Sequence, residues 1–247
     1  MMSYRVPENV IDDQSYRVDW KIVSEHQDLS EGFIWKFQDR VDWEKISEHQ
    51  TLSEYFIREF EDRVDWSKIS EYQDLSEDFI WDFADRVDWE KISEYQTLSE
   101  YFIREFSDIV DWRDISEYQV LSESFIREFA DKVNWAIISW SQTLSESFIR
   151  EFANKVDWFW ISKYQTLSEP FIKEYADKLN WDALKKNRNL SHINIDSLHT
   201  EYLTSKADFA ALGRKAGAAA MKEQAAQPQK VEKTEVQSNT QSKSRKR

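Results

Sequence analysis

The chain has 247 residues, with 33 Lys and Arg against 47 Asp and Glu, so its formal net charge is −14. It contains no Cys, which excludes disulfide bonds, thiolate metal sites and a Cys nucleophile. No apolar run approaches the roughly 20 residues that span a bilayer, and the polar N-terminus does not read as a secretory signal. We therefore expect an intracellular, cytoplasmic protein with no membrane partner. Only 3 Gly and 3 Pro accompany 12 Trp and 15 Phe, which predicts helices joined by very short turns.

A repeat of 23 residues organises most of the chain. Trp recurs at this step from Trp20 to Trp181, and Leu recurs likewise from Leu29 to Leu190. The unit reads V-D-W-x-x-I-S-E-Y-Q-x-L-S-E-x-F-I-x-x-F-x-D-x, and we call the residues at one position of it a column. Seven copies occupy residues 18–178. Residues 1–17 are predicted to be an N-terminal capping half-repeat and residues 179–203 a degenerate C-terminal capping repeat.

Each unit has the pattern of a helical hairpin, as the third copy illustrates. Asp65 and Ser76 are favoured N-cap residues, because their side-chain oxygens accept hydrogen bonds from the first free N–H groups of a helix. Helices are therefore predicted over about 66–73 and 77–86. One such hairpin buries too few apolar side chains to offset the entropy lost on ordering it, so units must stack. The predicted fold class is an all-α solenoid of short helical hairpins.

The composition changes after the last repeat. Residues 204–226 are Ala-rich and predict a marginal helix with Ser205 as its N-cap, and the polar residues 227–247 predict a disordered tail. Residues 181–247 contain 13 Lys or Arg and 7 Asp or Glu, a net charge of +6, whereas the whole chain carries −14. Residues 1–180 therefore carry −20, so an acidic array precedes a basic tail.

The string V-D-W-x-x-I-S-x-x-Q-x-L-S-E-x-F-I-x-x-F, over about residues 6–200, resembles tandem repeats in uncharacterised proteins of giant nucleocytoplasmic DNA viruses. Such families resemble the ankyrin-type arrays of the same viruses, which are generally taken as interaction surfaces. The resemblance implies a host-interaction or virion-associated role, in the host cytoplasm or the virion. It brings no catalytic residues with it, and the last 40 or so residues lie outside it.

Polar columns have mostly structural interpretations. The Gln column (Gln27, Gln50, Gln73, Gln96, Gln119, Gln142, Gln165) is either a ladder of amides on a binding face or a set of structural hydrogen bonds, and we favour the second. The Ser column from Ser24 to Ser162 is interpreted as a small residue at a tight helix crossing, since no His or Lys accompanies it to activate a nucleophile. The four His and the many carboxylates show no ligand spacing. We expect no catalytic, metal or cofactor site.

Columns that vary between units are better candidates for binding, because packing does not dictate them. On the second helix, one column carries Trp and Arg, the residue types enriched in interface hot spots, and its neighbour carries Tyr. The candidate partner-binding residues are Trp35, Arg58, Trp81, Arg104, Arg127, Arg150, Tyr55 and Tyr101. The alternative is ordinary Arg–Glu pairing on a solvated face. Trp140 and Trp160 are additional aromatic residues on the first helix and predict a second apolar patch.

These features favour a non-enzymatic scaffold that binds a protein partner of unknown identity. The alternative is a nucleic-acid-associated protein acting through its tail, in which Lys243, Arg245, Lys246 and Arg247 also suit a nuclear-import signal. An array of charge −20 would repel phosphates, so nucleic-acid binding would have to be local to the tail and lost with salt.

Overall fold

The computed structural model describes residue 8 and residues 18–226 of the chain. The described residues form α-helices, one short 3-10 helix and turns, with no strand, which confirms the predicted all-α class. The chain divides into two compact units, Met1–Ile193 and Asn194–Arg247. The first unit contains the repeats, and the second contains one long helix.

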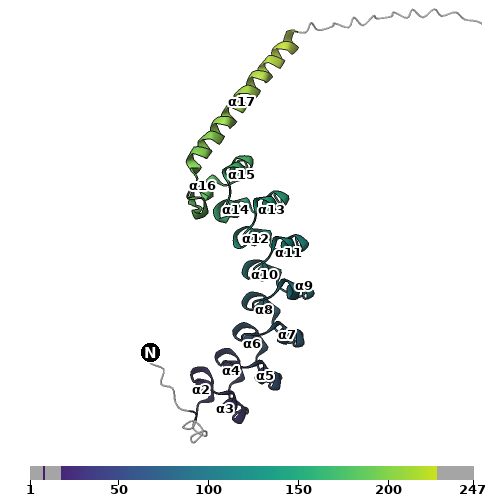
Figure 1. Ribbon diagram of the computed structural model, residues 1–247, viewed down its shortest axis with the longest axis vertical. Helices are drawn as coiled ribbons and strands as arrows, with labels where there is room; N and C mark the ends of the chain where they lie inside the picture. Colours follow the sequence, from purple (N-terminus) through teal and green to yellow (C-terminus); the bar gives the residue numbers. More distant parts are fainter. Residues whose placement is uncertain (1–7, 9–17, 227–247) are drawn as a thin grey trace, which may run out of the picture. The chain divides into compact units, whose positions relative to one another are not determined.

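Each repeat is a pair of short helices, and Figure 1 shows the first helices along one side of the array and the second helices along the other. Each first helix packs against the first helix of the next repeat, so the stacking is regular. The first helices are α2 (Trp20–His26), α4 (Trp43–His49), α6 (Trp66–Tyr72), α8 (Trp89–Tyr95), α10 (Trp112–Tyr118), α12 (Trp135–Ser141) and α14 (Trp158–Tyr164). The second helices are α3 (Glu31–Lys36), α5 (Glu54–Glu59), α7 (Glu77–Asp82), α9 (Glu100–Glu105), α11 (Glu123–Glu128), α13 (Glu146–Glu151) and α15 (Glu169–Glu174).

The helix starts are fixed by side-chain caps. In the third repeat, Asp65 Oδ1 accepts a hydrogen bond from the Lys68 N–H at 3.1 Å, and Ser76 Oγ accepts one from the Phe79 N–H at 3.2 Å. The equivalent caps recur in the other repeats, with Asn134 replacing Asp in the sixth. The predicted N-caps are therefore confirmed, and each cap satisfies one N–H that the short helix leaves free.

The second helix is shorter than the sequence pattern predicts. In the third repeat it ends at Asp82, four residues before Arg86, because Phe83 leaves the helical region with φ −114° and ψ 28°. The chain then makes a tight turn, whose Ala84 carbonyl accepts a hydrogen bond from the Trp89 indole N–H at 2.9 Å. The next repeat thus supplies the hydrogen-bond donor for this carbonyl, which a longer helix would otherwise have to provide.

The core is a continuous line of Phe and Ile side chains. In the third repeat, Ile69, Phe79 and Ile80 are almost completely buried. The half-buried Trp66 ring stacks on Phe79 with centroids 6.3 Å apart, and lies 4.9 Å from Phe83. The other full repeats have the same ring contacts, with Tyr175 in place of the second Phe in the seventh. From Trp43 on, each Trp of a full repeat therefore joins the turn of the preceding repeat to the aromatic pair of its own.

The array ends in the altered eighth repeat, which contains α16 (Trp181–Lys186) and the 3-10 helix η2 (Arg188–Leu190). In the second unit, α17 (Ile195–Ala226) begins nine residues before the predicted position 204. Asn194 Oδ1 accepts a hydrogen bond from the Ser197 N–H at 3.0 Å, so Asn194 caps this helix. The prediction of Ser205 as the N-cap is therefore wrong, because Ser205 lies inside the helix. The predicted disordered tail lies outside the described residues, as does the N-terminal half-repeat apart from Glu8.

Candidate interaction surface

The Gln column joins successive repeats. Gln96 Oε1 accepts a hydrogen bond from the Leu75 N–H at 3.1 Å, and its Nε2 donates to the carbonyls of Ser70 at 3.0 Å and Gln73 at 2.8 Å. The same three bonds recur from Gln50 to Gln165, and these six Gln residues are all buried. These amides satisfy main-chain groups of the preceding repeat and offer no surface to a ligand.

The Ser column also joins repeats, through a pair of hydrogen bonds that the sequence pattern did not predict. Ser70 Oγ donates to the Trp66 carbonyl at 2.7 Å and accepts from the Asp88 N–H of the next repeat at 3.0 Å. The side chain is fully buried. The hydroxyl is therefore required as both donor and acceptor, and small size alone does not explain it. The signal was present in the sequence, since all seven repeats carry Ser and none carries Ala or Gly.

A third link uses the Glu that follows each N-cap Ser. Glu31 Oε1 accepts a hydrogen bond from the Ser53 N–H of the next repeat at 2.6 Å. Glu8 makes the equivalent contact with the Ser30 N–H, also at 2.6 Å. Residue 8 therefore occupies the position that Glu31 holds in a full repeat.

The candidate Trp residues are half-exposed, but they also contact the next repeat. The Trp35 ring lies edge-on to Phe60 with centroids 4.9 Å apart, and Trp81 lies edge-on to Phe106 at 4.8 Å. Their exposed fractions are 44% and 46%. One edge of each indole thus covers a Phe pair, while the rest of the ring is available to a partner.

The Arg residues of the same column form ion pairs between repeats. Arg104 donates from Nε and Nη2 to the two carboxylate oxygens of Glu128 at 2.9 and 2.8 Å. This hydrogen bonding raises the pKa of Arg104 and lowers that of Glu128. The equivalent pairs are Arg58–Asp82, Arg127–Glu151 and Arg150–Glu174. The pairing alternative therefore describes the Arg members of the candidate set.

The Trp members break this row of ion pairs. The acids 24 residues after Trp35 and Trp81 are Glu59 and Glu105, which occupy the position of Glu128 without an Arg opposite them. Trp35 instead lines a hollow together with Tyr55 of the next repeat, which is 67% exposed. Tyr101, 62% exposed, holds the same position in the sequence relative to Trp81 as Tyr55 does relative to Trp35.

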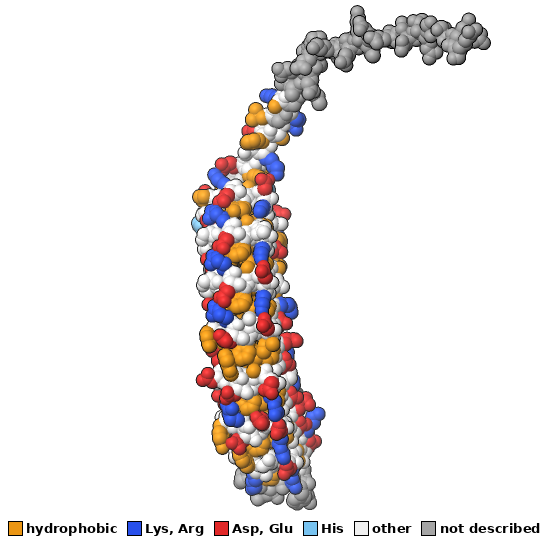
Figure 2. All heavy atoms as spheres, turned by 90° about the vertical axis from the view of Figure 1, so that its right-hand side faces the viewer, with side chains coloured by type: hydrophobic (Ala, Val, Ile, Leu, Met, Phe, Trp, Pro, Cys, Tyr) orange, Lys and Arg blue, Asp and Glu red, His pale blue; other side chains and the backbone are white. Residues whose placement is uncertain are grey.

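We call Trp35 with Tyr55, and Trp81 with Tyr101, the two Trp–Tyr patches. The first of them borders a shallow hollow, where Gly32 leaves open space between Trp35 and Tyr55. Figure 2 shows this face of the array, on which hydrophobic patches alternate with rows of basic and acidic side chains.

The described residues contain no group of three His, Cys, Asp or Glu side chains arranged to hold a metal ion. Within the same residues, no helix combines the length and apolarity that crossing a membrane requires. The tail residues Lys243, Arg245, Lys246 and Arg247 lie outside the described part. No family model, curated protein or solved structure matches this chain. The resemblance to viral repeat proteins therefore stays a prediction.

Proposed function

We propose that this protein is a non-enzymatic scaffold that binds a protein partner through its two Trp–Tyr patches. The observation that carries the proposal is the replacement of Arg by Trp at positions 35 and 81, in a column whose Arg residues otherwise pair with acids of the next repeat. Packing tolerates Arg at this position, so it does not demand the two Trp residues. A partner that covers the exposed rings would account for them.

The chemistry of the patches supports this role. Trp and Tyr bury large rigid surfaces with little loss of side-chain entropy, and they dominate the binding energy of many protein interfaces. The two patches have the same residue types at equivalent positions, two repeats apart on one array. One partner that contacts both would gain from their fixed spacing, because the second contact is intramolecular once the first has formed.

The test replaces the patches with the residue that other repeats carry. In the double variant Trp35→Arg/Trp81→Arg, each new guanidinium would lie opposite Glu59 or Glu105, in the arrangement of Arg104 and Glu128. The fold should therefore survive, which circular dichroism checks. Affinity capture from the native cell should lose the partner with this variant and keep it with the matched control Arg127→Lys. Equal capture by both variants would overturn the proposal.

A further inference from the structure

The first-helix side of the array carries a second row of ion pairs, which is confined to its N-terminal half. Lys45 Nζ lies 3.3 Å from Glu48 in the second repeat, and Lys68 of the third repeat lies 3.6 Å from the same carboxylate. Lys91 of the fourth repeat lies 3.7 Å from Glu71. Two columns thus neutralise each other across adjacent repeats, the Lys of one repeat with the Glu of the repeat before it.

The Lys column changes from the fifth repeat on, and the Glu column changes from the sixth. The Lys column continues as Asp114, Ile137 and Trp160, and the Glu column as Glu117, Trp140 and Lys163. The position opposite Glu94 therefore holds an acid, and the position opposite Glu117 holds an Ile. No ion pair among the described residues involves Glu94, Asp114 or Glu117. Glu94 and Glu117 thus lack the Lys of the following repeat that this row supplies elsewhere, Glu94 keeping its interaction with Lys91 of its own repeat, and Asp114 adds a third carboxylate.

Asp114 is the most unusual of the three. It is only 7% exposed, and its carboxylate accepts no side-chain or main-chain hydrogen bond from the described residues. Burial, followed by the nearby charges of Asp111 and Glu94, raises its pKa. A buried carboxylate without a partner is costly. Nothing in the packing requires this cost, because Lys occupies the same position in three earlier repeats.

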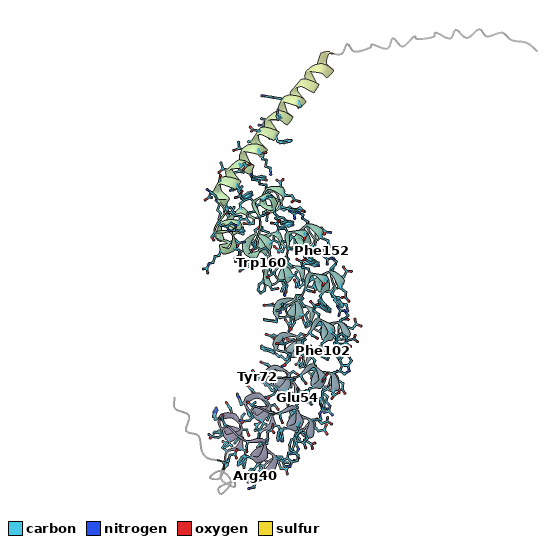
Figure 3. The ribbon with its side chains drawn as sticks, in the orientation of Figure 1. Arg40, Glu54, Tyr72, Phe102, Phe152 and Trp160 are labelled. Carbon is cyan, nitrogen blue, oxygen red and sulfur yellow. The ribbon has the colours of Figure 1, made fainter. Side chains whose placement is uncertain are left out.

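Exposed aromatic side chains follow directly along the array. The Trp160 ring stacks on Tyr164 with centroids 5.6 Å apart, and Phe159 lies 4.9 Å from Trp160. Trp140 holds the Glu column in the sixth repeat, and Trp160 holds the Lys column in the seventh. In the N-terminal repeats these two positions carry the Glu and Lys that pair with each other. Trp140, Phe159 and Tyr164 all retain more than a third of their surface exposed. Figure 3 shows Trp160 on the same side of the array as Tyr72, the side of the first helices.

We infer that these residues form one docking surface for a partner segment that carries an Arg or Lys beside an apolar or aromatic side chain. We call Glu94, Asp114, Glu117, Trp140 and Trp160 the acidic–aromatic surface. The cation of the partner takes the place of the missing Lys and pairs with Asp114, and its apolar neighbour covers the indoles. Charge complementarity selects this occupant, because an array of charge −20 attracts basic peptides and repels nucleic acid and acidic peptides.

The surface is independent of the two Trp–Tyr patches. It lies on the first helices α8 to α14, whereas the patches lie on the second helices α3 to α9. Arg fits it better than Lys, since a planar guanidinium pairs with carboxylates and stacks on aromatic rings at once. Loss of one surface should therefore leave binding at the other unchanged.

The test selects a phage-displayed library of random short peptides on the immobilised full chain. Selected peptides are then titrated against the wild type, Asp114→Lys, and Trp140→Glu/Trp160→Lys. Each substitution introduces the residue of the earlier repeats, so the fold should be retained, as melting curves will check. A synthetic peptide of residues 227–247 is a further arm, and Trp35→Arg/Trp81→Arg is the matched control.

We expect enrichment of peptides that combine a basic and an apolar residue. Their affinity should be at least about tenfold lower for both surface variants and unchanged for the control. Enriched peptides without a basic residue, equal affinity for all variants, or no enrichment would each overturn the inference. Binding of the 227–247 peptide with loss in Asp114→Lys would also overturn it, since the occupant would then be the chain's own tail. Self-association of the wild type that is lost in Asp114→Lys would overturn it as well, since the occupant of the surface would then be a second copy of this chain.

Discussion

The side-chain amide of Gln96 donates a hydrogen bond to the main-chain carbonyl of Gln73 at 2.8 Å, and the two residues hold the same position in successive repeats. Through this column, each repeat supplies hydrogen-bond partners to main-chain N–H and carbonyl groups of the preceding repeat. The array is therefore joined by directional hydrogen bonds as well as by its apolar core. That regular framework is what makes the irregular residues, at positions 35, 81, 114, 140 and 160, stand out.

The Gln96→Leu variant tests the amide links. Leu cannot replace the three hydrogen bonds, so the Leu75 N–H and two carbonyls would be left buried without partners. At about 1–3 kcal/mol for each such group, we expect a loss of about 3 kcal/mol or more in the free energy of unfolding, measured by urea denaturation. The exposed neighbour Thr97→Ala should change it by less than about 0.5 kcal/mol. Similar losses for both would show that the amide is dispensable.

The Ser column makes a separate prediction. Ser70→Ala removes the acceptor of the Asp88 N–H inside the array and should cost about 1–3 kcal/mol in urea denaturation. Ser67→Ala, on the same helix but exposed, removes only a surface contact with Asp88 and should have a much smaller effect. If the two variants unfold at the same denaturant concentration, the hydroxyl of Ser70 has no structural role.

Asp114 predicts an unusual dependence of stability on pH. Burial raises the pKa of this carboxyl in the folded state above its unfolded value, so the folded chain binds the proton more tightly. The ionised group therefore destabilises the fold at neutral pH, and this cost disappears as the pH falls below the unfolded pKa. The melting temperature of Asp114→Asn should exceed that of the wild type at pH 7, and the difference should shrink towards about pH 4. The exposed Asp78→Asn is the control, and a difference that grows on acidification would contradict the assignment.

Trp35 and Phe56 differ in how much of their ring is buried, and therefore in how much each contributes to the free energy of unfolding. Phe56 is almost fully buried, so Phe56→Ala should cost about 3–5 kcal/mol. Trp35 is half-exposed and touches the next repeat by one edge, so Trp35→Ala should cost clearly less. Equal losses in thermal unfolding would show that Trp35 is a core residue and not part of a binding patch.

Much of the fold could be predicted because local signals agree in every repeat. Asp65 and Ser76 mark helix starts through a contact only three residues long, which sequence spacing specifies well. The end of the second helix depends on the Trp of the following repeat, and this partner is not visible in a local pattern. The early start of α17 was missed because Asn194 lies within the predicted capping repeat, at the position where the full repeats carry Phe, which hides its role as a cap.

The candidate surface could be predicted only in part. Variation between repeats identified Trp35 and Trp81, but it could not separate them from the Arg residues of the same column. That distinction needs the positions of Glu128 and Glu151, which lie 24 residues further along the chain and pair across the repeat boundary. Asp114 was missed for the same reason. The Lys residues that hold its position in earlier repeats pair with a Glu of the preceding repeat, and Asp114 cannot.

Site-specific photo-crosslinking tests the scaffold proposal most directly. A photoreactive phenylalanine analogue replaces Tyr55 or Tyr101, the exposed Tyr residues of the Trp–Tyr patches, or Ser124 or Ser147, which hold the same column in later repeats. Irradiation in the native cell should attach one protein partner at positions 55 and 101 and none at 124 and 147. Equal labelling along the whole column, or no labelling at 55 and 101, would contradict the proposal that these patches bind a partner.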